Sequence, residues 1–303
     1  MAIRVSVVVP TSNRRATLEH VLPTLMHQAY DPAAYEILLC DAGSTDGTRE
    51  LVDTLRPANL TLLTLPNRGR ASARNAGIRQ ARGEIVLFTD ADILADPRLI
   101  GEHARAHERH ANAAIVGRVV EVGSLDAYRR AAAEPSARSR VHPPRERPLS
   151  WLFFVTGSAS VRREVLVGAG LFDEASGAYG HEDLELGYRL QRRGVRIIYW
   201  PSAVNYHWHP ESLDERSAKK RLSGEATIRF YRKHRDWRIL VRLGVNPFSL
   251  GWHAVLSEDG RVMRACRARA ARSRTCRAMV LEHAYLSGVK AALTDWRRGG
   301  ARA

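Results

Sequence analysis

The chain has 303 residues, 45% of them hydrophobic, with 22 glycines and 13 prolines, which is typical of a folded protein and excludes disordered and collagen-like classes. Lys and Arg (47) outnumber Asp and Glu (32), giving a formal net charge of +15. Three scattered cysteines are too few for a disulfide framework or a zinc cluster, so we expect a reducing, cytoplasmic compartment.

The first half of the chain alternates between apolar runs and amphipathic segments. Strands are predicted at 3–9, 35–40, 60–65 and 84–89, and helices at 48–55, 71–81, 97–110 and around Leu18, Val21, Leu22 and Leu25. Runs that are apolar on both faces and separated by helices predict an α/β fold with a mostly parallel central sheet flanked by helices. In such sheets ligands bind at the carboxyl ends of the strands.

Each of the four predicted strands is followed by a polar loop. These loops are 10–14, 41–47, 67–69 and 90–92. For 41–47, one interpretation is a turn with a helix cap, since Ser, Thr, Asp and Gly favour both. That interpretation explains 44–48 but not the acid, Asp41, at the very end of a buried strand.

The fourth loop, Asp90-Ala91-Asp92, carries two carboxylates. In an extended chain they point to the same side, about 6–7 Å apart. Two like charges so placed favour a hard cation, Mg²⁺ or Mn²⁺, which would bridge to phosphate oxygens. The alternative is a solvated turn before a helix that starts at Asp96-Pro97, and it is equally compatible with the spacing. The position of the loop in the series of strand ends favours the cation.

The second half contains a further acidic cluster and a histidine pair. Glu182 and Asp183 precede a predicted helix that stops at Gly194, so they suit a helix N-terminus, whose field also keeps a carboxylate ionised as a general base requires. His207 and His209 lie on one face of a strand predicted at 204–208, which by itself is a weak metal signal.

Residues 124–150 are polar and punctuated by proline, and they predict a long loop. Its arginines include Arg138, Arg140, Arg145 and Arg147. Either the loop orders over the site or it is a surface insertion without a role. Trp151 follows, and either stacking on a sugar ring or packing in the core fits it.

Seven ordered segments resemble a family 2 glycosyltransferase of the GT-A fold. They are VSVVVPTSNR, DAGSTDGT, PNRGRASARNAGI, LFTDAD, GSASVRREVLVGAGLFDE, GHEDLELGYRLQRRG and YHWHP, and the resemblance covers about residues 3–235. It implies transfer of a sugar from a nucleotide-diphosphate-sugar, a UDP-sugar being favoured, to an acceptor hydroxyl, with inversion and with Mn²⁺ or Mg²⁺. It also implies a place in cell-surface polysaccharide, glycolipid or related glycoconjugate synthesis.

The resemblance also implies roles for individual residues. The donor nucleotide-sugar is expected to contact Pro10, Thr11, Ser12, Asn13, Asp41, Arg68, Arg74, Asn75, Asp90 and Ala91. Asp92 and His207 are the expected metal ligands, with His209 as second choice, and Asp183 is the expected base, with Glu182 orienting the acceptor or the metal region. Acceptor contacts are expected at Trp151, Gly157, Ser158 and His181.

Two positions depart from the family pattern. The family often has a second acid where this chain has Ala42, and an aromatic residue that stacks on the base is common where this chain has Ser12. Asp41 is kept, so donor binding is still expected, while the preference for a base is harder to infer.

The positive charge lies almost entirely in the last part of the chain. Residues 1–212 carry a net charge of +2, and 213–303 carry +13. We therefore predict a catalytic domain at 1–212, with a nucleotide-sugar half at 1–122 and an acceptor half at 151–212, and a basic, mainly helical extension at 213–303. The extension either packs on the catalytic domain or docks on an anionic membrane, which would make the enzyme peripheral on the inner face of the plasma membrane. No apolar run spans a bilayer and no signal peptide is evident at the start.

Two other functions would explain part of the sequence. A basic nucleic-acid-binding protein would leave the strand-end acids unused, so no nucleic-acid partner is expected. A sugar nucleotidyltransferase shares the α/β architecture and is distinguished by releasing pyrophosphate. The expected partners are a nucleotide-sugar donor and a saccharide or lipid-linked acceptor.

Overall fold

The computed structural model describes residues 2–55, 58–133, 146–176, 180–208 and 212–300. The chain divides into two compact units, Met1–Glu174 with Asp183–Pro210, and Ala175–Glu182 with Glu211–Ala303. The second unit thus takes in residues 175–182, which the sequence analysis places in the catalytic domain.

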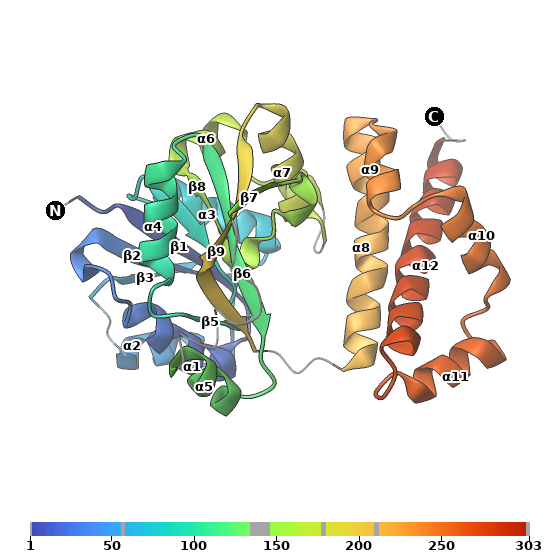
Figure 1. Cartoon of the computed structure of the whole chain (residues 1–303), viewed down its shortest axis with the longest axis horizontal. Coiled ribbons are helices and arrows are strands. Elements are labelled where there is room, and N and C mark those ends of the chain that lie inside the picture. The colour runs from blue at the N-terminus through green and yellow to red at the C-terminus, as the bar shows by residue number, and fades with distance from the viewer. Residues whose placement is uncertain (1, 56–57, 134–145, 177–179, 209–211, 301–303) are drawn as a thin grey trace. The chain divides into compact units, whose positions relative to one another are not determined.

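The first unit begins with the predicted alternation of strands and helices (Figure 1). Its first elements are β1 (Val5–Thr11), α1 (Arg15–Met26), η1 (Pro32–Ala34), β2 (Tyr35–Asp41), α2 (Thr48–Leu55), β3 (Leu60–Thr64), α3 (Arg70–Gln80) and β4 (Ile85–Phe88). All seven residues of β1 and of β2 are buried, as expected for strands covered on both faces. The four side chains predicted to form the apolar face of α1 are fully buried in the same core.

Nine strands among the described residues form one sheet, in the order β3-β2-β1-β4-β8-β6-β9-β5, with β7 paired to β9. The pairs β1–β2, β2–β3 and β1–β4 are parallel, as predicted, whereas β8 is antiparallel to both β4 and β6. The predicted α/β sheet with flanking helices is confirmed, and its carboxyl edge is formed by β3, β2, β1 and β4.

The remaining elements before the helical part of the chain complete the sheet, and residues 175–182 among them belong to the second unit. These elements are β5 (Ile93–Ala95), α4 (Leu99–Arg109), β6 (Ala113–Glu121), α5 (Leu125–Ala133), β7 (Arg147–Leu149), η3 (Trp151–Phe153), η4 (Thr156–Ser158), β8 (Ala159–Arg162), α6 (Arg163–Gly168), η5 (Glu174–Ser176), α7 (Glu182–Arg192) and β9 (Arg196–His207). The strand predicted at 204–208 is therefore only the end of a twelve-residue strand, whose first part pairs with β6 and β7.

The predicted loop at 124–150 is partly wrong, because it contains the helix α5 and the strand β7. The hydroxyl of Ser124 accepts a hydrogen bond from the Ala127 amide, which caps α5. Tyr128 anchors the helix by donating to the carbonyl of Ala95 at 3.1 Å and by an edge contact with Tyr206. Residues 134–145, with Arg138, Arg140 and Arg145, lie outside the described residues.

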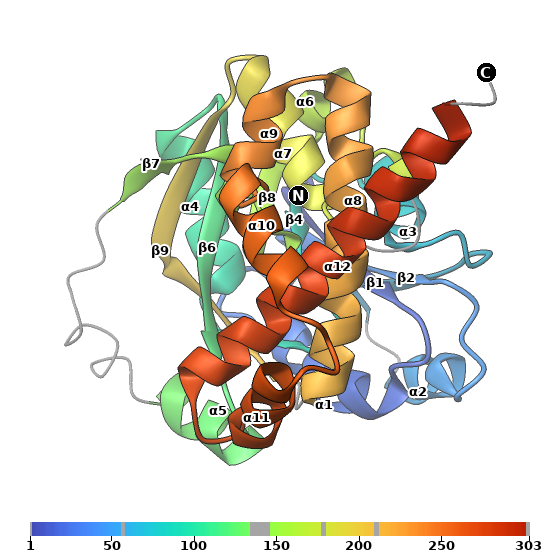
Figure 2. The same cartoon turned by 90° about the vertical axis from the view of Figure 1, so that its right-hand side faces the viewer.

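The second unit is helical (Figure 2). Its helices are α8 (Leu213–His234), α9 (Trp237–Arg242), α10 (Pro247–Val255), α11 (Arg261–Arg269) and α12 (Arg274–Gly300). The two long helices, α8 and α12, cross at glycines, because a Cβ at Gly224 would lie 2.0 Å from the carbonyl oxygen of Tyr285 and one at Gly288 would lie 1.9 Å from that of Arg221. In the part of the chain that is described, no helix has the length and apolarity to cross a membrane.

Candidate active site

The polar loops after β1, β2, β3 and β4 lie at one edge of the sheet, as predicted. Thr11 at the end of β1 is in register with Asp41 at the end of β2, which is in register with Thr64. The Ala42 amide continues the pairing by donating to the carbonyl of Thr11 at 2.9 Å. The edge therefore combines one buried carboxylate with several hydroxyl groups.

Asp41 is almost completely buried and organises the loop that follows it. Its carboxylate accepts hydrogen bonds from both the amide and the hydroxyl of Ser44. The Ser44 hydroxyl in turn accepts from the Asn13 amide at 2.8 Å, and the Asn13 side chain accepts from the Thr45 amide at 2.8 Å. Asn13 has a φ of 50°, a left-handed conformation that Asn tolerates better than most residues. The first and second loops are thus locked together.

Asp46 supports the turn-and-cap interpretation for the rest of this loop. Its carboxylate accepts from the Arg15 amide at 2.8 Å and from the Thr48 hydroxyl at 2.6 Å, so it caps the first turns of both α1 and α2. Burial would raise the pKa of Asp46, but the hydrogen bonds from Thr48 and Arg15 outweigh it and lower this pKa. Asp46 therefore has a structural role as a helix cap, whereas Asp41, at the end of β2, is the acid of this loop that could contact a ligand at the edge of the sheet.

Thr11 carries a polar atom that the protein does not satisfy. Only 6% of Thr11 is exposed, and its hydroxyl oxygen has no hydrogen-bond partner among the described residues. An unsatisfied buried hydroxyl costs roughly 1–3 kcal/mol, which a bound polar ligand at this edge would recover. Neighbouring Pro10 is buried in β1, and Ser12 donates to the carbonyl of Ala42 at 3.4 Å.

Asp90 and Arg74 form a largely buried ion pair next to the same edge. Arg74 Nη2 lies 2.8 Å from Asp90 Oδ1, the arginine is 1% exposed, and its guanidinium lies 5.7 Å from the ring centroid of Phe172. Asp90 itself is 30% exposed, so its carboxylate is oriented from behind by Arg74 and stays accessible. Ala91 is buried, and Arg68 is exposed on the loop before α3.

The amide of Asn75 is used within the protein. Its Nδ2 donates to the carbonyl of Phe172 at 2.9 Å and to Glu174 at 2.8 Å, and its Oδ1 accepts from the Phe172 amide. The hydrogen bond from Asn75 is the main reason that the pKa of Glu174 is lowered. Asn75 therefore ties 172–174 to α3, and its contact with a nucleotide stays a prediction.

Asp92 and His207 are brought together by the pairing of β5 with β9. His207 Nε2 lies 3.8 Å from Asp92 Oδ1, and the Trp208 amide donates to the carbonyl of Asp92 at 2.9 Å. The other ring nitrogen, Nδ1, lies 3.0 Å from a carboxylate oxygen of Glu121, the residue in register with His207 on β6. A carboxylate only accepts, so Nδ1 carries the proton, and in the neutral ring Nε2 is left as the nitrogen that could ligate a metal.

These residues fit a divalent metal. One carboxylate and one imidazole facing each other, with the imidazole oriented by a second carboxylate, is a common arrangement at metal sites. Within the described ranges, no group of three or more His, Cys, Asp or Glu side chains could hold a metal, and Asp92 and His207 are two candidate ligands. The second-choice ligand, His209, lies outside the described residues.

Asp183 lies in the first turn of α7, as predicted for the base. The helix is held firmly because Arg189 pairs with the buried Glu185 at 2.7 Å and donates to the carbonyls of Ala169 and Leu171. The positive end of the helix macrodipole favours the ionised form of a carboxylate at this position. Glu182 precedes it in the chain and belongs to the second unit.

Two of the predicted acceptor residues are buried. Trp151 has its ring 5.7 Å from that of Tyr188, a contact that fits the core-packing alternative. Ser158 is buried and its hydroxyl has no hydrogen-bond partner among the described residues, while the carbonyl of Gly157 accepts from Asn205 at 2.8 Å. The contact of these three residues with an acceptor stays a prediction.

His181 also has a structural partner. Its Nε2 lies 2.9 Å from the hydroxyl of Thr227 on α8, within the second unit. Burial lowers the pKa of His181 to about 4, so the ring is neutral at physiological pH. Its predicted contact with an acceptor stays a prediction, while its hydrogen bond fixes the segment just before Glu182.

Three residues of this region were missed by the sequence analysis. Glu121 orients His207, and Phe172 and Glu174 receive Arg74 and Asn75. Phe172 and Glu174 lie in the segment GLFDE, which belongs to one of the seven segments that resemble the family, but no role was assigned to either residue. Glu121 stands in an unremarkable strand, and only the register of β6 with β9 reveals it.

Comparison with known proteins identifies the family of the chain. Residues 6–168 match the family model described as Glycosyl transferase family 2. Validoxylamine A glucosyltransferase of Streptomyces hygroscopicus subsp. limoneus is 33% identical over 267 residues, covering 76% of this chain and 56% of that protein. The uncharacterized glycosyltransferase YfnE of Bacillus subtilis is 26% identical over 260 residues, covering 69% and 66%. The matched region thus spans between 56% and 66% of the length of these two relatives.

Two solved structures are similar over almost the whole chain. The mannosyltransferase PcManGT from Pyrobaculum calidifontis, in complex with GDP-Man and Mn²⁺, has a TM-score of 0.63 at 24% identity and covers 97% of this chain and 88% of its own. TarS 1-349 of S. aureus in complex with UDP has a TM-score of 0.60 at 18% identity, with coverages of 98% and 92%. At these identities the likeness establishes the shared GT-A fold.

Proposed function

The chain belongs to glycosyltransferase family 2, and from that premise we propose that it transfers a sugar from a UDP-sugar to an acceptor hydroxyl, with inversion at the anomeric carbon. The observation that carries the proposal is the pairing of Asp92 with His207 beside the Arg74–Asp90 ion pair, at the edge where parallel strands end. That edge offers both the acids for a metal and a polar surface for a nucleotide.

The donor would lie along the ends of β1, β2 and β4. The buried carboxylate of Asp41 and the unsatisfied hydroxyl of Thr11 are suited to hydrogen bonds with the base and ribose. Arg74, which is buried, would orient the Asp90 carboxylate for a contact with the ribose. Asn13 and Ser12 would shape the donor site through the contacts that link the first two loops.

Asp92 and His207 would hold the divalent metal, Mn²⁺ or Mg²⁺, and Glu121 would keep the His207 ring in the orientation required. The bound metal would neutralise charge on the diphosphate leaving group, which lowers the barrier to departure. The structure of the mannosyltransferase PcManGT, which is similar in fold, contains Mn²⁺, and this supports the choice of metal.

Asp183 would act as the base. Its carboxylate accepts the proton of the acceptor hydroxyl while that oxygen forms a bond to the anomeric carbon, and the bond from this carbon to the phosphate oxygen breaks to release the nucleoside diphosphate. Attack from the face opposite the leaving group inverts the anomeric configuration. Glu182, its neighbour, would orient the acceptor or the metal region.

The acceptor is proposed only as a class, a saccharide or a lipid-linked saccharide. The relatives include a validoxylamine A glucosyltransferase, a chondroitin synthase and a poly(ribitol-phosphate) N-acetylglucosaminyltransferase, whose acceptors differ widely. A lipid-linked acceptor, as in polysaccharide or glycolipid synthesis, would require the enzyme to work on the cytoplasmic face of a membrane.

A screen of nucleotide-sugars tests the proposal. The purified chain is incubated with UDP-, GDP-, dTDP- and CDP-sugars in Mn²⁺, and the released nucleotide is identified by chromatography. We expect UDP from a UDP-sugar, with no release in EDTA. Release of GDP alone would overturn the choice of base, and release of pyrophosphate from a nucleoside triphosphate and a sugar phosphate would instead identify a nucleotidyltransferase.

A further inference from the structure

The helix α10 exposes an apolar face that no described residue of its own unit covers. Phe248 and Val255 are each 84% exposed, and Gly251 lies between them at helical spacing, so the three occupy one face. On the preceding helix, α9, Trp237 is 63% and Val241 is 52% exposed, again one turn apart. We call Trp237, Val241, Phe248 and Val255 the apolar face.

The opposite side of α10 is packed, so the helix has a defined orientation. Leu250 and Trp252 pack against the core that α12 forms around Leu286, and His253 lies 3.0 Å from the hydroxyl of Ser287. The exposure of Phe248 and Val255 is therefore fixed by the way the rest of the helix is anchored. A 9-residue helix without Asp, Glu, Lys or Arg that holds Phe248 and Val255 exposed is unusual for a surface that only faces water.

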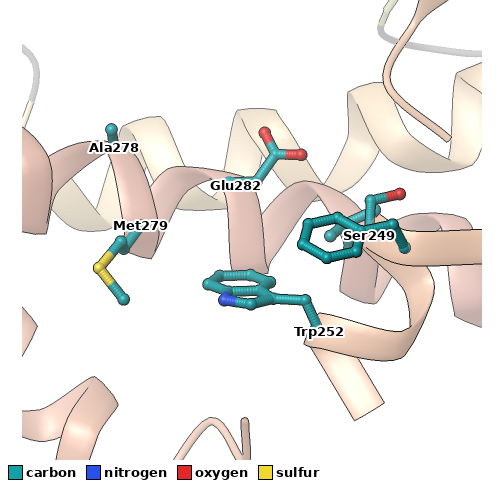
Figure 3. Close-up of a pocket in the computed structure, with 7 residues that line it drawn as sticks. Ser249, Trp252, Ala278, Met279 and Glu282 are labelled. Atoms are coloured by element: carbon teal, nitrogen blue, oxygen red, sulfur yellow. The ribbon is translucent and has the colours of Figure 1, made fainter. Parts of the chain in front are cut away.

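An apolar groove adjoins this face. It has a volume of about 410 Å³ and lies between α10 and α12, where Figure 3 shows the indole of Trp252 facing Met279 and Glu282. Its lining residues are Phe248, Ser249, Trp252, Ala278, Met279, Glu282 and Leu286. Apart from Glu282 and Ser249, these lining side chains are apolar and could contact a hydrocarbon chain.

The segments that carry and follow the apolar face in the sequence are strongly basic. Residues 237–277 contain nine arginines and two acids. One of these acids, Glu258, is already paired with Arg267 at 3.0 Å. Arg238 and Arg242 follow Trp237 and Val241 directly on α9, and Arg261 and Arg264 are exposed on α11. Apolar side chains between arginines match a surface that offers both hydrocarbon and negative charge.

We propose that the apolar face docks this protein onto an anionic phospholipid membrane. Phe248 and Val255 enter the boundary between headgroups and acyl chains, and the arginines of α9 and α11 contact lipid phosphates. The groove beside Trp252 provides space for part of an acyl chain. A second copy of the chain fits less well, since two faces that each carry this excess of arginine would repel one another. This inference goes beyond the proposed function and does not depend on it.

Vesicle sedimentation with the full chain tests the proposal. Vesicles of phosphatidylcholine alone and of phosphatidylcholine with about one third phosphatidylglycerol are compared at low ionic strength and at about 0.5 M salt, where surface attraction is screened. We expect binding to the anionic vesicles that weakens in salt. The double variant Phe248→Ser/Val255→Ser should bind at least about tenfold more weakly, because it lacks the two apolar side chains that the membrane would bury.

Matched controls keep the test decisive. Val167→Ser removes an exposed valine from α6, and Arg193→Gln/Arg196→Gln removes two exposed charges from the first unit; both should bind like the unchanged chain, whereas Arg238→Gln/Arg242→Gln should lose affinity. All these positions are exposed, and unchanged melting temperatures confirm folding. Equal sedimentation of the double variant and the Val167 control overturns the proposal. It is also overturned if vesicles fail to bind and sedimentation velocity shows that the double variant abolishes self-association.

Discussion

At the scale of single residues, the site depends on side chains that hold other side chains. Arg74 orients Asp90, and Glu121 orients His207, while Asn75 binds the main chain of Phe172. None of these three relationships is local in sequence, since the partners are 16, 86 and 97 residues apart. Motifs in the sequence predict donor and metal residues, whereas the side chains that orient Asp90 and His207 follow only from the packing of the sheet.

Replacing the proposed base should separate binding from transfer. Asp183→Asn keeps the shape and hydrogen-bonding size of the side chain but cannot take a proton, so we expect turnover to fall by about 10² or more with UDP affinity unchanged. Initial rates and calorimetric UDP binding give the two readouts. Asp126→Asn, in the exposed first turn of α5, is the control, and turnover of Asp183→Asn equal to that control would remove Asp183 from this role.

The metal site should depend on a residue that does not touch the metal. Glu121→Gln leaves the fold intact but weakens the hydrogen bond that sets the His207 ring, so the affinity for Mn²⁺ in the presence of UDP should fall by about tenfold. Titration of Mn²⁺ followed by its paramagnetic resonance signal measures this. Glu19→Gln on the exposed side of α1 should leave the affinity unchanged, and an unchanged value for Glu121→Gln as well would show that Glu121 does not support the site.

A buried histidine pair makes stability depend on pH. The hydroxyl of Ser160 lies 2.8 Å from His103 Nδ1 and 2.9 Å from His107 Nε2, so it can donate to one ring and accept from the other while both are neutral. Burial lowers the pKa of His103 to about 3 and that of His107 to about 4. The remaining ring nitrogens are buried without partners among the described residues, so a proton there would be poorly accommodated.

Acid should therefore destabilise the protein before its carboxylates titrate. In the unfolded chain these rings have a pKa near 6.5, so between about pH 6.5 and 4 the unfolded state binds more protons and the free energy of unfolding falls as the pH falls. The loss at about pH 4.5 should be roughly 3 kcal/mol per histidine. Urea unfolding at pH 7 and 4.5 measures it. His107→Gln should reduce the loss by roughly the 3 kcal/mol assigned to one histidine. His27→Gln, at an exposed position, should not reduce it, and equal losses for the two variants would contradict the assignment.

At the scale of elements, periodicity predicted the first half of the chain well. The predicted strands and helices up to α4 lie within a few residues of their observed bounds; β1 and β2 are buried throughout, whereas no residue of β3 is buried. The strands β5 and β6 were not predicted, and further errors are in α5 and β9. Ser124 and Tyr128 stabilise α5 through hydrogen bonds that cannot be inferred from the polar composition of the segment. The first part of β9 pairs with β7, a strand that was not predicted either.

The crossing of α8 and α12 tests how the second unit is held together. Gly288→Ala would place a methyl group 1.9 Å from the carbonyl oxygen of Arg221, so the helices must separate, at a cost of about 1–3 kcal/mol or more. Thermal unfolding measures the loss. Gly251→Ala in α10 has nothing within 4 Å and should stabilise slightly, by up to about 1 kcal/mol. Equal melting temperatures for the two variants would contradict close packing at this crossing.

At the scale of the whole molecule, the charge and the chemistry are separated along the chain. The net charge of +15 is carried almost entirely by residues 213–303, whereas the residues proposed for donor, metal and base lie before them. Family membership and fold could be predicted because ordered motifs mark the ends of successive strands. No motif identifies the acceptor, and the burial of Trp151 and Ser158 adds no information about its chemistry.

The most direct test of the central claim is calorimetric binding of UDP to the chain in Mn²⁺ and in EDTA, with the Asp92→Ala variant alongside. We predict that UDP binds to the unchanged chain in Mn²⁺, that EDTA weakens binding at least about tenfold, and that Asp92→Ala in Mn²⁺ resembles the unchanged chain in EDTA. Equal UDP affinity in Mn²⁺ and EDTA, or an Asp92→Ala variant that keeps the full effect of Mn²⁺, would contradict a metal-dependent nucleotide-sugar site at this edge of the sheet.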